Sequence, residues 1–440
     1  MTYEFPPSGG GGVQRIAKLA RFLPENGWNP VVVTAEVVSG RPRDDSLVAD
    51  VASVRIVRTP ARHVSTAVSR TISPGKVLAN ALRHRRPSDF STRTPSGESD
   101  SVPAGVVMRG SSLSLRISRW IAMPDDAAYW IAPAIKAGIA LVTSERARAV
   151  FASGPPFSVL VAAEKVARHL GVPLITDMRD GWNTNPLLTY PTAYHRSRAL
   201  ALERTVLGAS IATICSAPSI AEEATRLGGR NVHLVPNGFD AEDLPAHTPD
   251  PVAPLRLAFM GRVYPGLTDP APLIDALARA ATGGGPASGA EFDIVGSWPA
   301  ELEAYVEASI VAENVHFHSY RPHREALDLV SRADVGVAIV SASERAEGAT
   351  PAKLFEYLGM GMSVLLLAPG NGFPAAVLAE TGGGICVSPS DPDALDSALA
   401  DLAKRKAAGT LPAPSATAVA RYERRRSARE IAAVLDAATS

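Results

Sequence analysis

Two charged residues three positions apart lie on one predicted helix: Lys353 in its first turn and Glu356 one turn further. Free amides at a helix start can hold a phosphate or the hydroxyls of a sugar, and Lys353 adds a point charge there. Glu356 shares the helical face of Lys353 and can accept two hydrogen bonds from a ribose. An ordinary ion pair between the two is the alternative. A loop of small residues leads into this helix: Gly348, Ala349, Thr350 and Pro351.

An arginine follows the first predicted strand of the second half of the chain. Gly261 and Arg262 come directly after the apolar run 255–260. At the mouth of a parallel sheet, a guanidinium group matches the oxygens of a pyrophosphate and stays charged. We therefore expect Arg262 to contact phosphate, against the alternative of a surface arginine after a turn.

A glycine-rich loop near the N-terminus leads straight into another predicted helix. It spans residues 8–15 and includes Gly11, Gly12 and Arg15. Glycines let a phosphate or sugar approach the backbone at a helix start, although a flexible turn is the alternative. Only residues 1–5 precede the loop, so we expect either a late start or a short first strand.

A charged cluster of Asp177, Arg179 and Asp180 follows a predicted strand in the first half. In open α/β sheets, ligands bind beyond the carboxyl ends of the strands. The cluster is therefore a candidate acceptor site. An internal ion pair that braces the loop is an equally good interpretation.

These residues need a scaffold to bring them together. Apolar, β-branched runs alternate with helical patterns such as 14–26 and 157–171, which is typical of parallel sheets with crossover helices. The expected strands are 30–34, 54–57, 149–152, 174–176 and 211–215, then 255–260, 292–295, 315–317, 335–339 and 363–367. The predicted fold class is α/β, with two tandem Rossmann-like, doubly wound parallel-sheet domains facing across a cleft.

A proline-rich break at residues 240–254 separates the two sets of strands. We place an N-terminal domain at residues 1–245 and a C-terminal domain at residues 253–415. Residues 416–440 contain a helical pattern that we expect to brace the two domains. A segment rich in Ser, Arg, Pro and Gly, at about 85–115, predicts a mobile surface insertion.

The composition limits the function. The 44 basic and 44 acidic side chains cancel, so no global field attracts nucleic acid. Only two cysteines occur, each within an apolar run, which favours a reducing, cytoplasmic location and argues against a cysteine-rich metal site. No leader-like stretch and no run of about eighteen apolar residues that could cross a bilayer is present.

Taken together, these motifs resemble the GT-B glycosyltransferases, specifically the retaining group that includes many bacterial sugar transferases of envelope and natural-product pathways. The resemblance covers nearly the whole chain. The most specific match joins the Pro-Asn-Gly-Phe-Asp run at 236–240 to the Lys-x-x-Glu helix at 353–356. Weaker matches are the runs at 3–7, 153–156 and 177–182.

The resemblance implies roles for these residues. A nucleoside-diphosphate sugar would lie on the second domain, with Glu356 on the ribose and with Arg262 and Lys353 on the diphosphate as the catalytic cations. The loop 348–351 and Gly261 would line the donor site, and the acceptor would enter past Gly11 and Gly12. No cofactor and no metal are expected, because cationic side chains and helix amides stabilise the departing diphosphate. The acceptor is left open among natural products, glycans and lipid-linked molecules.

The chain departs from the pattern of these relatives in three places. Gly348 stands where many carry a glutamate, Leu267 and Thr268 stand where a basic residue is frequent, and no histidine lies near 155–156. Two alternatives therefore stay open. One is a non-catalytic partner protein that kept the cleft, and the other is a sugar-nucleotide epimerase of similar architecture.

A basic stretch suggests a membrane contact. Residues 51–88 contain no acidic side chain but accumulate arginines, and apolar residues at mixed helical spacing follow at 113–121. Such a surface can attach peripherally to an anionic bilayer at the inner face of the membrane. The alternative is that Trp120 and its neighbours belong to the core.

Overall fold

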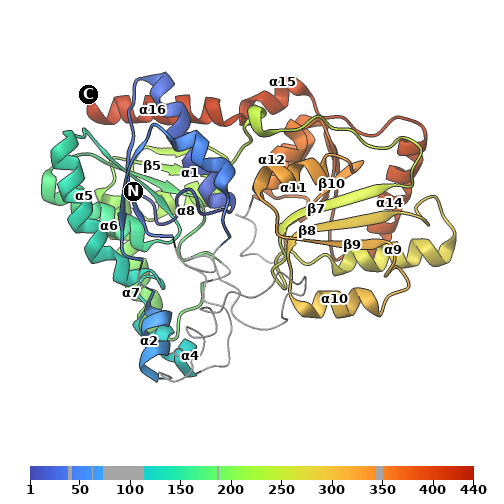
Figure 1. Cartoon of the computed structure of the whole chain (residues 1–440), viewed down its shortest axis with the longest axis horizontal. Coiled ribbons are helices and arrows are strands. Elements are labelled where there is room, and N and C mark those ends of the chain that lie inside the picture. The colour runs from blue at the N-terminus through green and yellow to red at the C-terminus, as the bar shows by residue number, and fades with distance from the viewer. Residues whose placement is uncertain (38–41, 62, 73–112, 186–187, 342–349) are drawn as a thin grey trace, which may run out of the picture.

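The computed structural model describes residues 1–37, 42–61, 63–72, 113–185, 188–341 and 350–440. They form two α/β domains, joined by a linker and by a C-terminal helix that runs back along the first domain (Figure 1). The insertion predicted at 85–115 lies almost wholly outside the described residues, as do Gly348 and Ala349. The two parallel-sheet domains confirm the predicted fold class.

The strands of the first domain are rich in Val, Ile and Thr, which pack well on a pleated surface. All are parallel; β1 pairs with β2, and a second sheet has the order β3-β4-β5-β6. The strands are β1 (Val31–Ala35), β2 (Arg55–Thr59), β3 (Val150–Gly154), β4 (Leu174–Met178), β5 (Ala212–Cys215) and β6 (Val232–Leu234). The five predicted strands are confirmed, and the short β6 was missed.

The first three residues lie between β1 and β3 and join the two sheets. The N–H of Thr2 donates to the carbonyl of Val33 at 3.1 Å, and the N–H of Ser153 donates to the carbonyl of Met1 at 3.1 Å. A very short extended segment therefore stands where the first strand was expected.

The sheet of the second domain has the order β12-β11-β10-β7-β8-β9, and all its strands are parallel. Its first strand is central, and the chain moves to one side and then to the other, which is the doubly wound arrangement. The strands are β7 (Arg256–Arg262), β8 (Glu291–Ser297), β9 (Val315–Ser319), β10 (Val335–Ile339), β11 (Ser363–Leu367) and β12 (Gly384–Val387). The five predicted strands are confirmed, whereas β12 was missed because its first residue is glycine.

Helices cover the sheets and connect the strands. In the first domain they are α1 (Gly11–Phe22), η1 (Leu23–Asn26), η2 (Asp45–Val51), α2 (Val64–Ile72), α4 (Leu113–Ile121), η3 (Ala128–Trp130), α5 (Ile131–Glu145), α6 (Ser158–Leu170), α7 (Ala193–Ala209) and α8 (Pro218–Arg226). In the second they are α9 (Ala271–Gly283), α10 (Ala300–Glu307), α11 (His323–Val330), α12 (Ala352–Gly359), α13 (Phe373–Thr381) and α14 (Pro392–Ala407).

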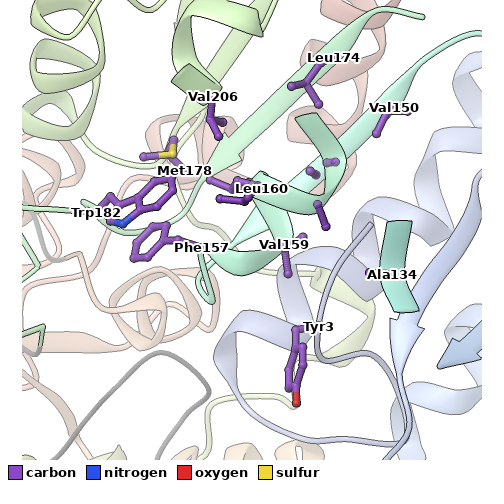
Figure 2. Close-up of a cluster of buried hydrophobic side chains, with 14 of the residues drawn as sticks. Tyr3, Ala134, Val150, Phe157, Val159, Leu160, Leu174, Met178, Trp182 and Val206 are labelled. Atoms are coloured by element: carbon purple, nitrogen blue, oxygen red, sulfur yellow. The ribbon is translucent and has the colours of Figure 1, made fainter. Parts of the chain in front are cut away.

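A buried aromatic pair fixes the loop that follows β4. Figure 2 shows Phe157 and Trp182 side by side next to Met178, and their rings stack with centroids 4.7 Å apart. Both side chains are fully buried. Such a pair contributes on the order of 1 kcal/mol beyond the area it buries, so the charged loop after β4 has a rigid base.

A buried lysine holds the linker that leaves the first domain. The Lys18 ammonium lies 2.7 Å from carboxylate oxygens of Asp50 and Asp240 and 2.6 Å from Asp243. Asp243, at the end of η4 (Ala241–Asp243), also pairs with Arg324 of α11 at 2.7 Å. Lys18 therefore pairs with three carboxylates at once. Two of them, Asp240 and Asp243, belong to the linker, so these ion pairs fix the start of the linker against the first domain.

The C-terminal segment contacts both domains. The short helix α15 (Ala416–Val419) and the turn η6 (Ala420–Tyr422) pack on the second domain, where Tyr422 lies against Phe355. Helix α16 (Arg424–Thr439) packs instead on α1 and η1, burying Ile431 and Leu435. The chain therefore crosses from one domain to the other twice.

Candidate functional site

The carboxyl ends of β7 and β10 meet at the point where the second sheet reverses its strand order. This is the position at which open α/β sheets bind ligands. Gly261 and Arg262 end β7, and Thr350 and Pro351 lead from the loop after β10 into α12. The topology thus brings together two segments that the sequence predicted separately as parts of a binding site.

Lys353 lies at this point with its ammonium over the face of Phe259, 3.4 Å from the ring centroid. Gly261 makes room for it, since an added Cβ there would come within 3.2 Å of the Lys353 nitrogen. Burial lowers the pKa of Lys353 to about 7, against the opposing charge of Glu356. The described part of the chain provides no ion pair for this ammonium, which suits a site that awaits an anion.

Glu356 is buried one turn further along α12 and is bonded to a histidine that the sequence reasoning missed. Its Oε1 lies 2.7 Å from Nε2 of His323, the first residue of α11. Burial opposes the ionised carboxylate, but His323, Arg424 and Lys353 hold the pKa of Glu356 below its usual range. A stable carboxylate here can accept sugar hydroxyls. The sequence did carry one indication of this histidine: His323 is the first residue of a helix that directly follows β9.

Arg262 is held at the mouth of the sheet by neighbouring side chains. Its Nε donates to Ser297 Oγ at 3.1 Å, and its guanidinium lies 5.8 Å from the centroid of the Tyr264 ring. Arg262 is the last residue of β7, so these contacts hold its guanidinium near the carboxyl end of the strand, where ligands bind in such sheets.

The glycine loop of the first domain is shaped by close packing. Gly10 has a φ of 115°, which favours glycine, and α1 begins directly after it. An added Cβ on Gly12 would lie 2.1 Å from a guanidinium nitrogen of Arg179, so any larger residue here would displace that guanidinium. Arg179 itself donates to the carbonyls of Gly154 and Pro155.

Arg15 and Asp177 form a buried ion pair. The Arg15 guanidinium donates to both carboxylate oxygens of Asp177, at 2.8 and 3.2 Å, and to the carbonyls of Val235 and Pro236. Arg15 is 5% exposed and Asp177 is fully buried. The partner of Asp177 is thus Arg15 of α1, which lies outside the cluster of Asp177, Arg179 and Asp180, and the acceptor role of that cluster stays a prediction. Asp180 is exposed, so an acceptor contact stays a prediction for it.

The two domains touch across their carboxyl-end loops. Asp44 Oδ2 accepts a hydrogen bond from the backbone N–H of His323 at 3.1 Å. Asn237 donates to the carbonyl of Thr350 at 3.3 Å, which links the end of the first domain to the helix start of α12. These two hydrogen bonds join the domains directly at their carboxyl-end loops.

No group of three or more His, Cys, Asp or Glu side chains among the described residues is placed to hold a metal ion. Within the same residues, no helix is long and apolar enough to cross a membrane.

Two family models match the chain. Residues 10–238 match the Glycosyl transferase 4-like domain, and residues 254–405 match Glycosyl transferases group 1. A search of curated protein sequences gave no significant match.

Solved structures share the fold. The Anabaena protein HepE in complex with UDP and glucose has a TM-score of 0.62 at 14% identity, over 99% of this chain and 98% of that one. The lipopolysaccharide outer core galactosyltransferase WaaB has a TM-score of 0.54 at 13% identity, over 99% of both chains. Sucrose-phosphate synthase from Thermosynechococcus elongatus has a TM-score of 0.54 at 16% identity, over 98% of this chain and 91% of that one.

Proposed function

Since the chain belongs to the Glycosyl transferase 4-like family, we propose that it moves a sugar from a nucleoside-diphosphate sugar to an acceptor with retention of configuration. The family and the GT-B fold make it a glycosyltransferase. The donor, the stereochemistry and the acceptor are the proposed parts.

The observation that carries the proposal is a buried lysine, for which the described residues provide no ion pair, three positions before a buried carboxylate on the same helix. Burial lowers the pKa of Lys353 to about 7, and Glu356 is kept ionised three residues later. A diphosphate would supply an anion for the Lys353 ammonium, and the hydroxyls of a ribose would donate hydrogen bonds to the Glu356 carboxylate. Neighbouring structures with bound UDP and UDP-glucose support uridine nucleotides as the first to test.

The proposed reaction breaks the bond between the anomeric carbon and the phosphate oxygen. The electron pair leaves with the diphosphate, whose growing charge Lys353 and Arg262 would stabilise without a metal. The acceptor hydroxyl would form its bond on the same face of the sugar and pass its proton to the departing phosphate. Closure of the domains would exclude water and so limit hydrolysis of the donor.

Calorimetric titration with UDP, GDP and dTDP tests the donor site. One nucleotide should bind in the micromolar to millimolar range, and Glu356→Ala should weaken that binding by about tenfold through loss of a charge-assisted hydrogen bond. Glu307→Ala is the matched control, because Glu307 is exposed on α10. Absence of binding to every nucleotide would contradict the proposal.

Product analysis separates the alternatives. NMR of the donor sugar incubated without acceptor would reveal an epimer if the chain were an epimerase. Nucleotide binding without transfer to any acceptor in a broad panel would instead favour a non-catalytic partner protein. A product with the anomeric configuration of the donor would support retention.

The acceptor side carries a second proposal, a peripheral contact with an anionic membrane. Trp120 on α4 is 59% exposed and Tyr194 on α7 is 68% exposed, and both rings pack on His195. Arg196 and Arg198 are exposed next to them. An exposed aromatic pair beside basic side chains suits the interface of an anionic bilayer, so a lipid-linked acceptor is favoured.

A further inference from the structure

His323 contacts the carboxylate of the donor site with its ring. Its Nε2 lies 2.7 Å from Glu356 Oε1, and the two side chains are 17% and 7% exposed. A carboxylate offers about four lone pairs, and this contact uses one of them. The remaining positions on Glu356 can still accept two ribose hydroxyls, while the histidine fixes the rotamer of the carboxylate.

The backbone of His323 contacts the other domain. Its N–H donates to Asp44 Oδ2 at 3.1 Å, across the boundary between the domains. Asp44 is buried and is oriented by Ser46, whose N–H and hydroxyl donate to the other carboxylate oxygen. His323 is thus bonded to the first domain on one side and to the donor carboxylate on the other.

Several charged groups face the His323 ring. Burial opposes its protonation, but Glu356 on α12 and Asp243 at the linker together raise the pKa of His323 above its usual value. Arg424 at the start of α16 opposes them. Asp44 accepts the backbone N–H of His323, and the charge of Lys353 also acts on the Glu356 carboxylate.

We propose that His323 is a positioning residue that couples closure of the two domains to the orientation of Glu356. When Asp44 accepts the N–H of His323, the ring is placed to hold Glu356 in the rotamer that receives the ribose. The idea rests on the proposed function, because it assumes that Glu356 binds the ribose of a nucleotide.

Calorimetry with UDP and 2′-deoxyuridine diphosphate at pH 6.0 to 8.5 tests this role. His323→Ala should weaken UDP binding by about tenfold, the loss expected for a hydrogen bond to a charged group. The affinity for the deoxynucleotide should fall less in this variant, because the deoxynucleotide lacks one of the hydroxyls that would donate a hydrogen bond to Glu356. His323→Gln should restore most of the UDP affinity, since its amide can donate in the same direction.

The pH dependence supplies a readout that a purely structural role would not move. The wild type should bind UDP more tightly than His323→Gln, and the ratio of the two affinities should be largest at pH 6.0. The ratio should fall as the pH rises, because His323 then loses its proton. Lys353 titrates equally in both proteins, so it cancels in the ratio. Thermal melts of each variant control for folding.

A double mutant tests the coupling. Asp44→Ala should weaken UDP binding by itself, but it should add little once His323 is already alanine, because the backbone contact with Asp44 acts only through the imidazole ring that it places. Two results would overturn the inference. One is an equal loss of affinity for UDP and for 2′-deoxyuridine diphosphate in His323→Ala, and the other is fully additive losses of UDP affinity in the double mutant. If Glu356→Ala weakens UDP binding and His323→Ala does not, the inference fails while the proposed function stands. If no nucleotide binds the wild type, the proposed function fails first.

Discussion

The ammonium of Lys353 lies 3.4 Å from the centroid of the Phe259 ring, and the described residues offer it no anion to pair with. An aromatic face compensates only part of the cost of burying a cation. The site is therefore poised to gain binding energy when an anionic group enters. This arrangement gives Lys353 its pKa of about 7.

Binding of UDP should take up a proton at pH 8. Free Lys353 is mostly neutral there because its pKa is about 7, and a bound diphosphate would raise that pKa again. The uptake should approach about one proton per UDP. Calorimetric titration in two buffers of different ionisation enthalpy measures it directly.

Lys353→Arg is the control for this proton uptake, because arginine stays charged in proteins. The variant should bind UDP with little proton exchange. An unchanged uptake in Lys353→Arg would assign the proton to another group.

Loss of Asp177 should destabilise the fold rather than change the acceptor. Asp177→Ala would leave the Arg15 guanidinium buried without its carboxylate, at a cost of about 3–5 kcal/mol. Ser153→Ala, which removes only one hydrogen bond to Asp177, should cost about 1 kcal/mol. Urea denaturation compares the two. A fully stable Asp177→Ala with a raised acceptor KM would instead restore the acceptor role.

Glu203 should make the protein less stable as the pH rises. Burial raises its pKa to about 7, and Asn183 donates to it at 2.6 Å. The folded state then binds a proton that the unfolded state releases near its ordinary pKa, so stability falls between about pH 4.5 and 7. The shift corresponds to about 3 kcal/mol.

Glu203→Gln should remove this pH dependence and raise the melting temperature at pH 8. Measurement of thermal unfolding from pH 5 to pH 8 for both proteins tests the expectation. Glu222→Gln, at an exposed position on α8, should leave the pH profile unchanged. A wild-type melting temperature that does not fall over this range would contradict the assignment to Glu203.

Replacement of Trp120 and Tyr194 by serine should reduce binding to vesicles that contain phosphatidylglycerol. Each removed aromatic ring takes away apolar area that would enter the bilayer interface. Co-sedimentation with vesicles measures the bound fraction, and phosphatidylcholine vesicles report the charge-dependent part. Tyr305→Ser is the control, since Tyr305 is exposed on α10 of the second domain. Equal vesicle binding by the wild type, the variant without Trp120 and Tyr194, and Tyr305→Ser would contradict the membrane contact.

Much of the fold follows from local patterns. Runs such as Val31–Ala35 and Ser363–Leu367 are apolar and β-branched, so they predict buried parallel strands without any knowledge of the tertiary structure. The missed strands have a physical reason. β6 is a three-residue edge strand with exposed side chains, and β12 begins with glycine, so neither carries an extended apolar signal.

The exposure of Trp120 was also beyond the sequence. The helical spacing of its neighbours fits a core position as well as a surface one, because periodicity gives a face but not its partner. The structure places Trp120 beside His195, from a helix more than seventy residues away, and leaves the indole largely exposed.

The sequence by itself determined the two α/β domains and the helix that carries Lys353 and Glu356. Those features depend on residues close together in the chain, where spacing sets geometry. Only the tertiary structure decided that Arg15 and Asp177 neutralise each other and that His323 reaches Glu356. Such pairs join different elements, so their contact depends on strand order and on the docking of one element against another. Spacing along the chain does not encode either of these directly.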